Sequence, residues 1–413
     1  MTIPTETDVL IVGGGPAGAL LGCLLARRGI GVLVAEKQTE LDRDFRGETL
    51  AAPSVVTLRK LGFGPALSSH GFLETAAVSM RMEGRRVFSV DYGKFGVDAL
   101  PVDIPQPALI GIFNEEAAGL PGYTRAAGTA CTGLLIEDGT VRGAVLKQKD
   151  GTRTEVRARL VVGADGRFSK VRKEAGLAAR IQPMERDFLS LKLPRPAGWG
   201  NHAELIVDRD KHLVVLPTWP DFLRVGHNLP KRGMGALRKE GFEAFRAGIA
   251  AIDPRLEPLM EEHLRSWDDT GFLEIFTAEV DQWARDGLIL IGDASHTCTP
   301  ILGQGVNLAI QDTVCLAPVI ARALAATPSG SVPAAEFDRF VATRRKHKTV
   351  VTRFQRMQER ALAQHTPMGV RLRRARFSVL DKLPVKYAVF GKVINAPHQV
   401  DPADLRVHLA HSR

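Results

Sequence analysis

Residues 8–18 read DVLIVGGGPAG, a short apolar run that ends in a glycine-rich turn. The run 8–12 is rich in β-branched residues, which predicts a buried parallel strand. The turn leads into residues 19–29, ALLGCLLARRG, whose apolar residues follow helical spacing up to a closing glycine. Residues 31–37, GVLVAEK, predict a second buried strand. The opening of the chain therefore predicts a strand, turn, helix and strand of the α/β class.

The residues of this unit predict a site for a dinucleotide. Gly13 permits the tight turn, Gly15 lets a pyrophosphate approach the backbone, and Gly18 lets helix and strand pack closely. The start of the helix, including Ala17, offers unpaired N–H groups to the phosphates. Glu36, near the end of the second strand, is placed to accept hydrogen bonds from a ribose hydroxyl. An acidic residue there would repel a 2′-phosphate, so the pattern favours FAD or NAD over NADP.

Composition limits the class of protein without choosing a function. The 413 residues correspond to two or three domains, and 45% hydrophobic with 24% charged residues is ordinary for a soluble globular protein. The net charge of +9 is compatible with nucleotides, nucleic acid or a membrane surface. The four cysteines form no C-x-x-C pair, so we expect no metal site, no disulfide framework and a cytoplasmic location. We expect neither a membrane-spanning helix nor a signal peptide.

Two further motifs choose between FAD and NAD. Residues 159–176 read RLVVGADGRFSKVRKEAG, in which a strand, a turn and the start of a helix follow one another. Residues 288–307 read LILIGDASHTCTPILGQGVN, in which an apolar strand runs into an Asp-containing loop. A helix is expected from about Gly305. A plain NAD dehydrogenase would leave both motifs unexplained.

The three motifs together resemble those of the single-component (group A) FAD-dependent aromatic monooxygenases, the para-hydroxybenzoate hydroxylase-like family. That family has GxGxxG, then GADGxxSxVR, then GDAxHxxxPxxGQGxN, and all three occur here in this order over residues 5–325. The resemblance implies a Rossmann-like FAD-binding domain of the glutathione-reductase type. It also implies an interleaved, mostly antiparallel β-sheet substrate domain and no separate domain for the nicotinamide nucleotide.

The resemblance also assigns roles to the third motif. It implies that Asp293 binds a ribityl or ribose hydroxyl of FAD. The loop from Pro300 to Gly305 would lie against the isoalloxazine ring, with Pro300 beside the C4a edge where oxygen reacts. Gly303 and Gly305, without Cβ atoms, would let backbone N–H groups approach the flavin carbonyl. The other cofactor-binding positions carried over in this loop are Gln304, Val306 and Asn307.

Other positions carry over from the family less directly. Arg46 matches an Arg that contacts FAD, and Gln106 stands where many members have an Arg, so that contact loses its charge. Asp165 resembles a residue tied to FAD and to handling of the nicotinamide nucleotide. Arg172 could contact a phosphate or form a salt bridge on the helix surface, and both interpretations stay open. His296 is interpreted as a residue that shapes the loop.

The expected organisation is discontinuous. Residues 1–75, 107–177 and 280–330 are predicted to form the FAD-binding domain, and residues 76–106 and 178–279 the substrate-binding domain. Residues 235–253 predict one helix crossing the substrate sheet. Residues 331–413 predict a basic helical C-terminal region, which we interpret first as a solvated face. Peripheral membrane or protein contact ranks second and nucleic-acid binding third.

The resemblance implies a function. It implies that NADH or NADPH reduces the FAD, and that a flavin C4a-hydroperoxide then inserts one oxygen atom from O2 into an electron-rich aromatic or polyketide-like small molecule. Secondary metabolism and aromatic catabolism both fit, and the protein is expected to be a monomer or homodimer. Tyr92, His212 and His227, on predicted strands, are candidates for activating a phenolic substrate.

Several alternatives stay open. A prenyl or ene reductase of the same superfamily would need no oxygen, and a flavin-binding redox partner would have no turnover of its own. A flavin halogenase is disfavoured because its W-x-W-x-I-P motif is absent. The sequence leaves the substrate, the regiochemistry and the choice between NADH and NADPH undecided. It also does not choose between hydroxylation, epoxidation and Baeyer–Villiger oxidation.

Overall fold

The opening unit of the sequence forms the centre of the first sheet. The computed structural model describes residues 3–40 and 48–394 of the chain. In it, β1 (Glu6–Val12) pairs in parallel with β2 (Val32–Glu36) and with β11 (Arg153–Gly163). The intervening helix, α1 (Pro16–Ala26), is almost wholly buried and packs against α4 (Gln106–Ala118) and α9 (Gln304–Ala326). The sheet is therefore covered by helices, as a parallel sheet requires.

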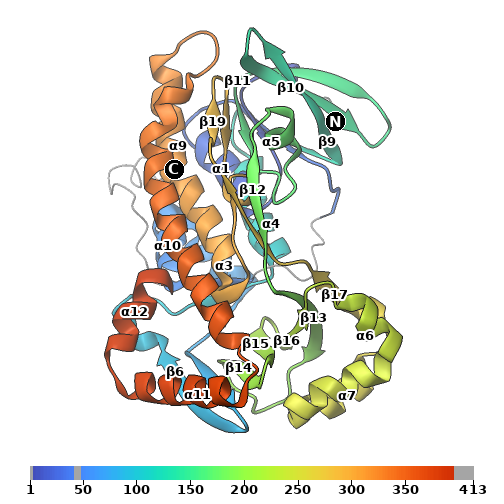
Figure 1. The fold of residues 1–413 in the computed structure, drawn as a ribbon. Coiled ribbons are helices and arrows are strands. Elements are labelled where there is room, and N and C mark those ends of the chain that lie inside the picture. The colour runs from blue at the N-terminus through green and yellow to red at the C-terminus, as the bar shows by residue number, and fades with distance from the viewer. Residues whose placement is uncertain (1–2, 41–47, 395–413) are drawn as a thin grey trace.

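The first sheet has eight strands, in the order β19-β20-β11-β1-β2-β8, with the hairpin β9–β10 joined to β11 (Figure 1). Its remaining strands are β8 (Tyr123–Ala127), β9 (Thr129–Glu137), β10 (Thr140–Gln148), β19 (Ala284–Arg285) and β20 (Leu288–Leu290). Its helices beyond α1 are α2 (Ala52–Leu58), α3 (Gly64–His70), α4 (Gln106–Ala118) and α5 (Lys170–Glu174). The central strands of this sheet are parallel, and the pairs β9–β10, β10–β11 and β19–β20 are antiparallel. The combination of this helix-covered sheet with a second sheet confirms the predicted α/β class.

A seven-stranded sheet lies below the first, in the order β17-β13-β16-β15-β14-β5-β6 (Figure 1). Only the β14–β5 pair is parallel, so the predicted mostly antiparallel character is confirmed. The strands are β5 (Ala77–Met82), β6 (Arg85–Asp91), β13 (Arg186–Pro194), β14 (His202–Asp208), β15 (Lys211–Thr218), β16 (Phe222–Pro230) and β17 (Thr270–Leu273). The division of the chain into domains stays a prediction.

The prediction of a single helix over residues 235–253 is wrong, because this segment forms two helices. Two helices, α6 (Met234–Glu240) and α7 (Phe242–Ile252), take its place, and α8 (Glu257–His263) follows. Gly241 adopts a φ of +99° between them, which ends α6 and turns the chain. The apolar residues of α7 and α8 then cover one face of the lower sheet.

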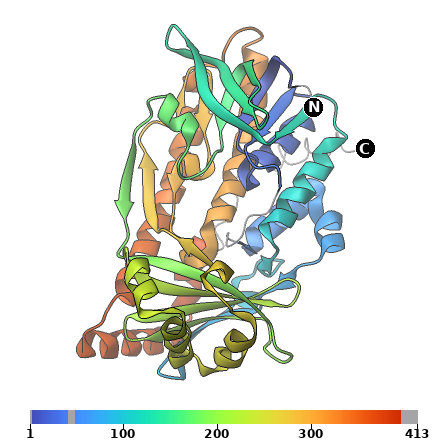
Figure 2. The ribbon, with the colours of Figure 1, turned by 90° about the vertical axis from the view of Figure 1, so that its right-hand side faces the viewer.

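Two three-stranded sheets connect the larger ones. β12 (Ala179–Pro183) and β18 (Phe276–Val280) pair along their length and run between the two large sheets (Figure 2). The short β21 (His296–Thr297) pairs with β18, which places the third sequence motif at this connection. The other small sheet is β3 (Thr49–Leu50), β7 (Val102–Asp103) and β4 (Leu73–Glu74).

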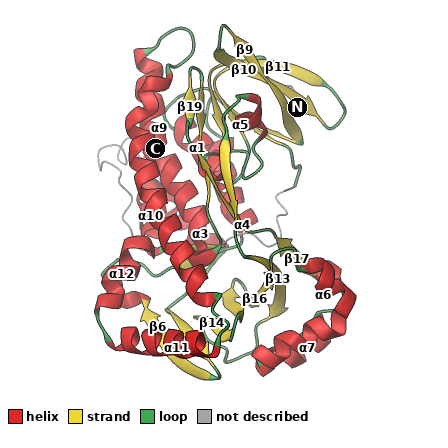
Figure 3. Ribbon diagram, viewed as in Figure 1, coloured by secondary structure: helices red, strands yellow, loops and turns green. Residues whose placement is uncertain are grey.

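Four helices end the described part of the chain, of which α9, α10 and α12 lie along one side and α11 along the bottom of the view in Figure 3. They are α9 (Gln304–Ala326), α10 (Asp338–Leu362), α11 (Pro367–Lys382) and α12 (Val385–Ile394). α10 packs along α9, and α11 packs under β6. Within the described residues, Ile301–Ala326 is the one helix long and apolar enough to cross a membrane by composition, and 72% of its apolar window is buried inside the structure.

The interpretation of the C-terminal basic residues as a solvated face is wrong for four of them. Arg344, Lys348, Arg373 and Lys386 are buried, with Lys348 only 1% exposed. Each is held by acceptors inside the protein; for example, Arg373 donates to the carbonyl of Leu362. Arg344 and Lys348 attach α10 to Asp312 of α9. Arg373 joins α11 to the end of α10 and to the carbonyl of Arg209, and Lys386 joins α12 to Asp381 of α11.

The buried carboxylate of Asp312 on α9 is the centre of this attachment. It accepts hydrogen bonds from Arg344 Nε at 2.8 Å, from Lys348 Nζ, and from the backbone N–H of Gly292 at 2.9 Å. Lys348 also lies over the ring of Trp283. Burial alone would raise the pKa of Asp312, but the two adjacent cations hold it below its usual value. The three charges are therefore satisfied together.

We expect Asp312→Ala to lower the free energy of unfolding by about 3–5 kcal/mol, because it leaves two buried cations without their anion. Urea unfolding followed by circular dichroism measures this change. The control is Asp281→Ala, which removes an exposed partner of Arg180 and should cost less than about 1 kcal/mol. Equal losses in the two variants would contradict the structural role of Asp312.

Candidate active site

The glycine-rich turn after β1 has the geometry that the sequence predicted. Gly13 has a φ of +107°, and a Cβ there would lie 2.4 Å from the carbonyl oxygen of Ala164. A Cβ on Gly18 would lie 1.8 Å from the carbonyl oxygen of Gly13. The first position therefore permits the turn and the second lets α1 approach β1. Because Ala164 belongs to the second motif, the turn also joins the first two motifs.

The start of α1 is open for an anion. Gly15 is the N-cap residue, and no side chain caps the helix. The first-turn N–H groups, including that of Ala17, therefore point out of the helix end without a side-chain acceptor. Such an end, with its positive dipole, suits a pyrophosphate. The residues at this position fit FAD.

Glu36 is fixed at the end of β2, beside the turn. Its buried carboxylate accepts hydrogen bonds from the N–H groups of Gly14 at 2.7 Å and of Gln38 at 3.0 Å. This places an acidic group next to the predicted phosphate site, as ribose binding needs. Arg46 lies outside the described residues, and Gln106 is buried at the first position of α4.

The second motif is held together by its own side chains. The carboxylate of Asp165 accepts hydrogen bonds from Ser169 Oγ and from the N–H groups of Lys170 and Val171 at the start of α5. Asp165 thus caps a helix in this structure, and its predicted contact with the cofactor stays a prediction.

Arg172 connects the second motif to the third. It is buried and donates to the carbonyl oxygens of Ala294 at 2.9 Å and Arg167 at 3.0 Å. It is therefore neither exposed nor in a surface salt bridge. The sequence alone did not indicate this connecting role.

Asp293, in the third motif, lies in the short helical turn Gly292–Ala294 that follows β20. Its side chain is one-third exposed, and one oxygen lies 3.6 Å from Arg167 Nε. The exposure leaves the carboxylate accessible to a cofactor hydroxyl. His296, in contrast, is buried against Thr352 with its Nε2 at 2.8 Å from that hydroxyl, in line with the interpretation of a loop-shaping residue.

The loop after Asp293 places backbone groups at its surface and side chains inside. Pro300 is exposed, and Gly303 has a φ of +60° directly before α9, which begins at Gln304. A Cβ on Gly305 would meet no atom within 4 Å, so space lies beside it. Asn307 is buried, and its amide bonds the carbonyl oxygens of Thr49 and Gly303.

Gln304 and Val306 are buried as well. The side-chain amide of Gln304 donates to the carbonyl of Leu302. The buried side chains of this loop therefore shape it, and the groups it can offer to a flavin are mainly backbone groups. Contact of these residues with FAD stays a prediction.

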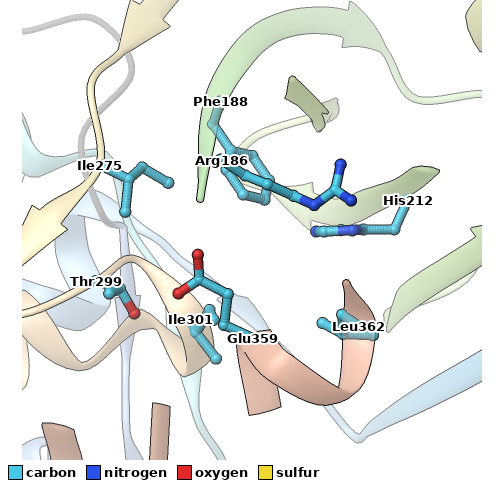
Figure 4. Close-up of a pocket in the computed structure, with 8 residues that line it drawn as sticks. All are labelled: Arg186, Phe188, His212, Ile275, Thr299, Ile301, Glu359 and Leu362. Carbon is cyan, nitrogen blue, oxygen red and sulfur yellow. The ribbon is translucent and has the colours of Figure 1, made fainter. Parts of the chain in front are cut away.

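A pocket lies between this loop, the lower sheet and the end of α10 (Figure 4). Thr299 and Ile301, which flank Pro300 in the sequence, form part of its wall. The other lining residues are Arg186, Phe188, His212, Ile275, Glu359 and Leu362. The sequence analysis missed all of them except His212, because they come from elements far apart in the chain.

Two of the three candidate substrate residues are neighbours, because the backbone of His212 hydrogen-bonds the ring of His227 on the adjoining strand. His212, on β15, lines the pocket, with its ring 5.4 Å from that of Phe188. His227, on β16, does not line it; its ring lies 6.2 Å from Phe245 of α7. Tyr92 was expected on a strand but begins the short helical turn Tyr92–Phe95 after β6. Burial raises the pKa of Tyr92, which disfavours a phenolate there.

Comparison with known proteins agrees with this geometry. The family model for the FAD binding domain matches residues 6–355. The chain is 34% identical over 392 residues to 6-methylpretetramide 4-monooxygenase of Streptomyces rimosus, covering 94% of this chain and 92% of that protein. It is 30% identical over 377 residues to a kynurenine 3-monooxygenase of Salinispora arenicola, covering 83% and 77%.

Solved structures show the same fold. PqsL of P. aeruginosa in complex with 2-aminobenzoylacetate aligns with a TM-score of 0.77 and 21% identity, over 92% of this chain and 100% of that one. Fold, motifs and relatives together define an FAD-dependent monooxygenase of the flavoprotein hydroxylase class. The chain belongs to the FAD binding domain family.

We expect Gly15→Val to lower FAD affinity by at least about tenfold, equivalent to about 1.4 kcal/mol, because the side chain blocks the pyrophosphate. Gly15 has a φ of −72°, which valine tolerates, so the protein should still fold. The ratio of flavin to protein and circular dichroism measure the two effects. Gly13→Val serves as the contrasting variant that should lose both FAD and stability. Normal FAD retention in Gly15→Val would refute the assignment of the turn.

Asp293→Ala should weaken FAD binding by about tenfold or more, because a hydrogen bond to a charged group contributes about 1.5–3 kcal/mol. Fluorescence titration of the apoprotein with FAD measures the affinity. Asp293→Asn keeps an oxygen acceptor and should lose less. An affinity unchanged in the alanine variant would remove Asp293 from the site.

Proposed function

We propose that the protein inserts one oxygen atom from O2 into an aromatic polyketide of the 6-methylpretetramide type. The main support for this proposal is the position of the pocket, whose wall includes Thr299 and Ile301 on either side of Pro300. A molecule bound there lies against the loop that the resemblance assigns to the flavin ring. The substrate named for the Streptomyces rimosus relative supports the polyketide class.

The residues of the chain position the reactants and exclude water. Gly13, Gly15 and Gly18 would hold the pyrophosphate of FAD, and Glu36 and Asp293 its hydroxyl groups. FAD, once bound, supplies the redox chemistry, with NADH or NADPH as the source of electrons. Phe188, Ile275 and Leu362 give the pocket the apolar surface that an aromatic ring needs.

The proposal also covers the cellular location, the oligomeric state and the partners of the enzyme. We propose a cytoplasmic monomer or homodimer that binds no nucleic acid. Peripheral membrane contact is supported by exposed apolar side chains on α11, on α12 and between them, near exposed Arg and Lys residues. These apolar residues are Met368, Leu372, Val379, Leu383, Val385 and Val389.

The test is to supply the holoprotein with 6-methylpretetramide, NADH or NADPH, and isotopically labelled O2. We expect faster NADH or NADPH oxidation when the substrate is present, and one labelled oxygen atom in the product by mass spectrometry. Conversion under nitrogen would instead identify an ene reductase. NAD(P)H oxidation that no aromatic polyketide accelerates would favour the redox-partner alternative.

A further inference from the structure

The pocket contains buried polar atoms that the protein does not satisfy. Arg186 Nε, His212 Nδ1, Thr299 Oγ1 and Glu359 Oε2 are buried and have no hydrogen-bond partner among the described residues. They come from β13, β15, the loop before α9 and α10, four segments far apart in the chain. Buried polar atoms are nearly always bonded in folded proteins, so four exceptions in one pocket need an explanation. A ligand with polar groups would satisfy them.

Glu359 is the acidic member of this set. It lies near the end of α10, and its carboxyl group points from the helix toward Arg186 and Phe188 of β13 (Figure 4). The backbone of Glu185 hydrogen-bonds the carboxyl group, and Oε2 is left without a partner. The group is therefore held in place and keeps one oxygen for a ligand.

The surroundings of Glu359 suit proton exchange near neutral pH. Burial raises its pKa to about 7, against the hydrogen bond from the Glu185 backbone, which lowers it. The charge of Glu185 raises the pKa further, and Arg186 and Lys231 lower it. His212 differs, because burial and Arg186 lower its pKa to about 3. A neutral histidine of this kind can form hydrogen bonds but cannot keep a proton at neutral pH. The carboxyl group is thus the better proton acceptor in the pocket.

We propose that Glu359 accepts the proton of a phenolic or enolic hydroxyl of the substrate, whose oxygen is then bound by Arg186 and Thr299. The O–H bond of the substrate breaks, its electron pair stays on the oxygen, and a new O–H bond forms at Oε2. The resulting phenolate is the more electron-rich ring that oxygen insertion requires. This inference rests on the proposed function and narrows its substrate to a hydroxylated aromatic compound rather than a bare hydrocarbon.

The test is Glu359→Gln in the holoprotein, with 6-methylpretetramide as the probe. The carboxyl group accepts a proton only when ionised, so the kcat of the unchanged protein should rise with pH up to about 7 and then level. In the variant we expect this inflection to disappear and kcat to fall by about 10²-fold or more, with a smaller change in KM. Glu359→Asp should restore the inflection in part. Glu261→Gln, an exposed change on α8, should behave as the unchanged protein.

Absorbance of the bound probe gives a second readout that does not depend on turnover. The unchanged protein should bind the probe as the phenolate at neutral pH, and the Gln variant as the phenol. FAD content and thermal unfolding show whether the variant is folded. Because burial disfavours the carboxylate, glutamine should be tolerated without loss of stability.

Two outcomes separate this inference from the proposed function. If the variant keeps both the inflection and the phenolate spectrum while labelled oxygen still enters the product, the role of Glu359 is refuted and the oxygenation stands. If the unchanged protein incorporates no labelled oxygen, the proposed function fails. The absorbance titration then still decides whether Glu359 takes the proton of a bound phenol.

Discussion

The buried carboxylate of Asp312 is the interaction on which the arrangement of this enzyme depends. It joins three segments: α9, the strand end at Gly292, and α10 through Arg344 and Lys348. Two cations close to one anion remove the cost that any of these charges would have alone in the core. The position of α10 relative to the segment that leads into α9 is fixed in this way.

Further contacts along α10 extend this control to the loop itself. Gln355, about two turns beyond Lys348, bonds the N–H and carbonyl of Thr299 and the carbonyl of Ile301. His296 bonds Thr352 on the same helix. A helix near the end of the chain therefore holds a loop that the sequence places before α9. The loop and the pocket wall that faces it are parts of one rigid assembly.

The cofactor side of the site could be predicted from the sequence because its determinants are local. Gly13 and Gly18 act within one strand and helix, and their geometry is as predicted. The contribution of α10 to the site could not be predicted, because its run of Arg and Lys residues resembles a solvent-exposed helix face. A signal was present: Phe340, Val351, Phe354 and Leu362 share the helical period with Arg344, Lys348 and Gln355. Reading that period would have placed this side of the helix in the core.

The resemblance also could not separate side chains that bind a ligand from those that shape the loop. Asn307 and Gln304 belong to the motif, yet their amides are used inside the protein. The contrast along α10 shows where binding groups remain. The charge of Lys348 is paired with that of Asp312, which favours stability. At Glu359, in contrast, the carboxyl oxygen Oε2 has no hydrogen-bond partner within the described part of the chain, and it lines the same pocket as Thr299 and Arg186. Because unpaired buried polar atoms reduce stability, the four that line this pocket are free to pair with polar groups of a ligand.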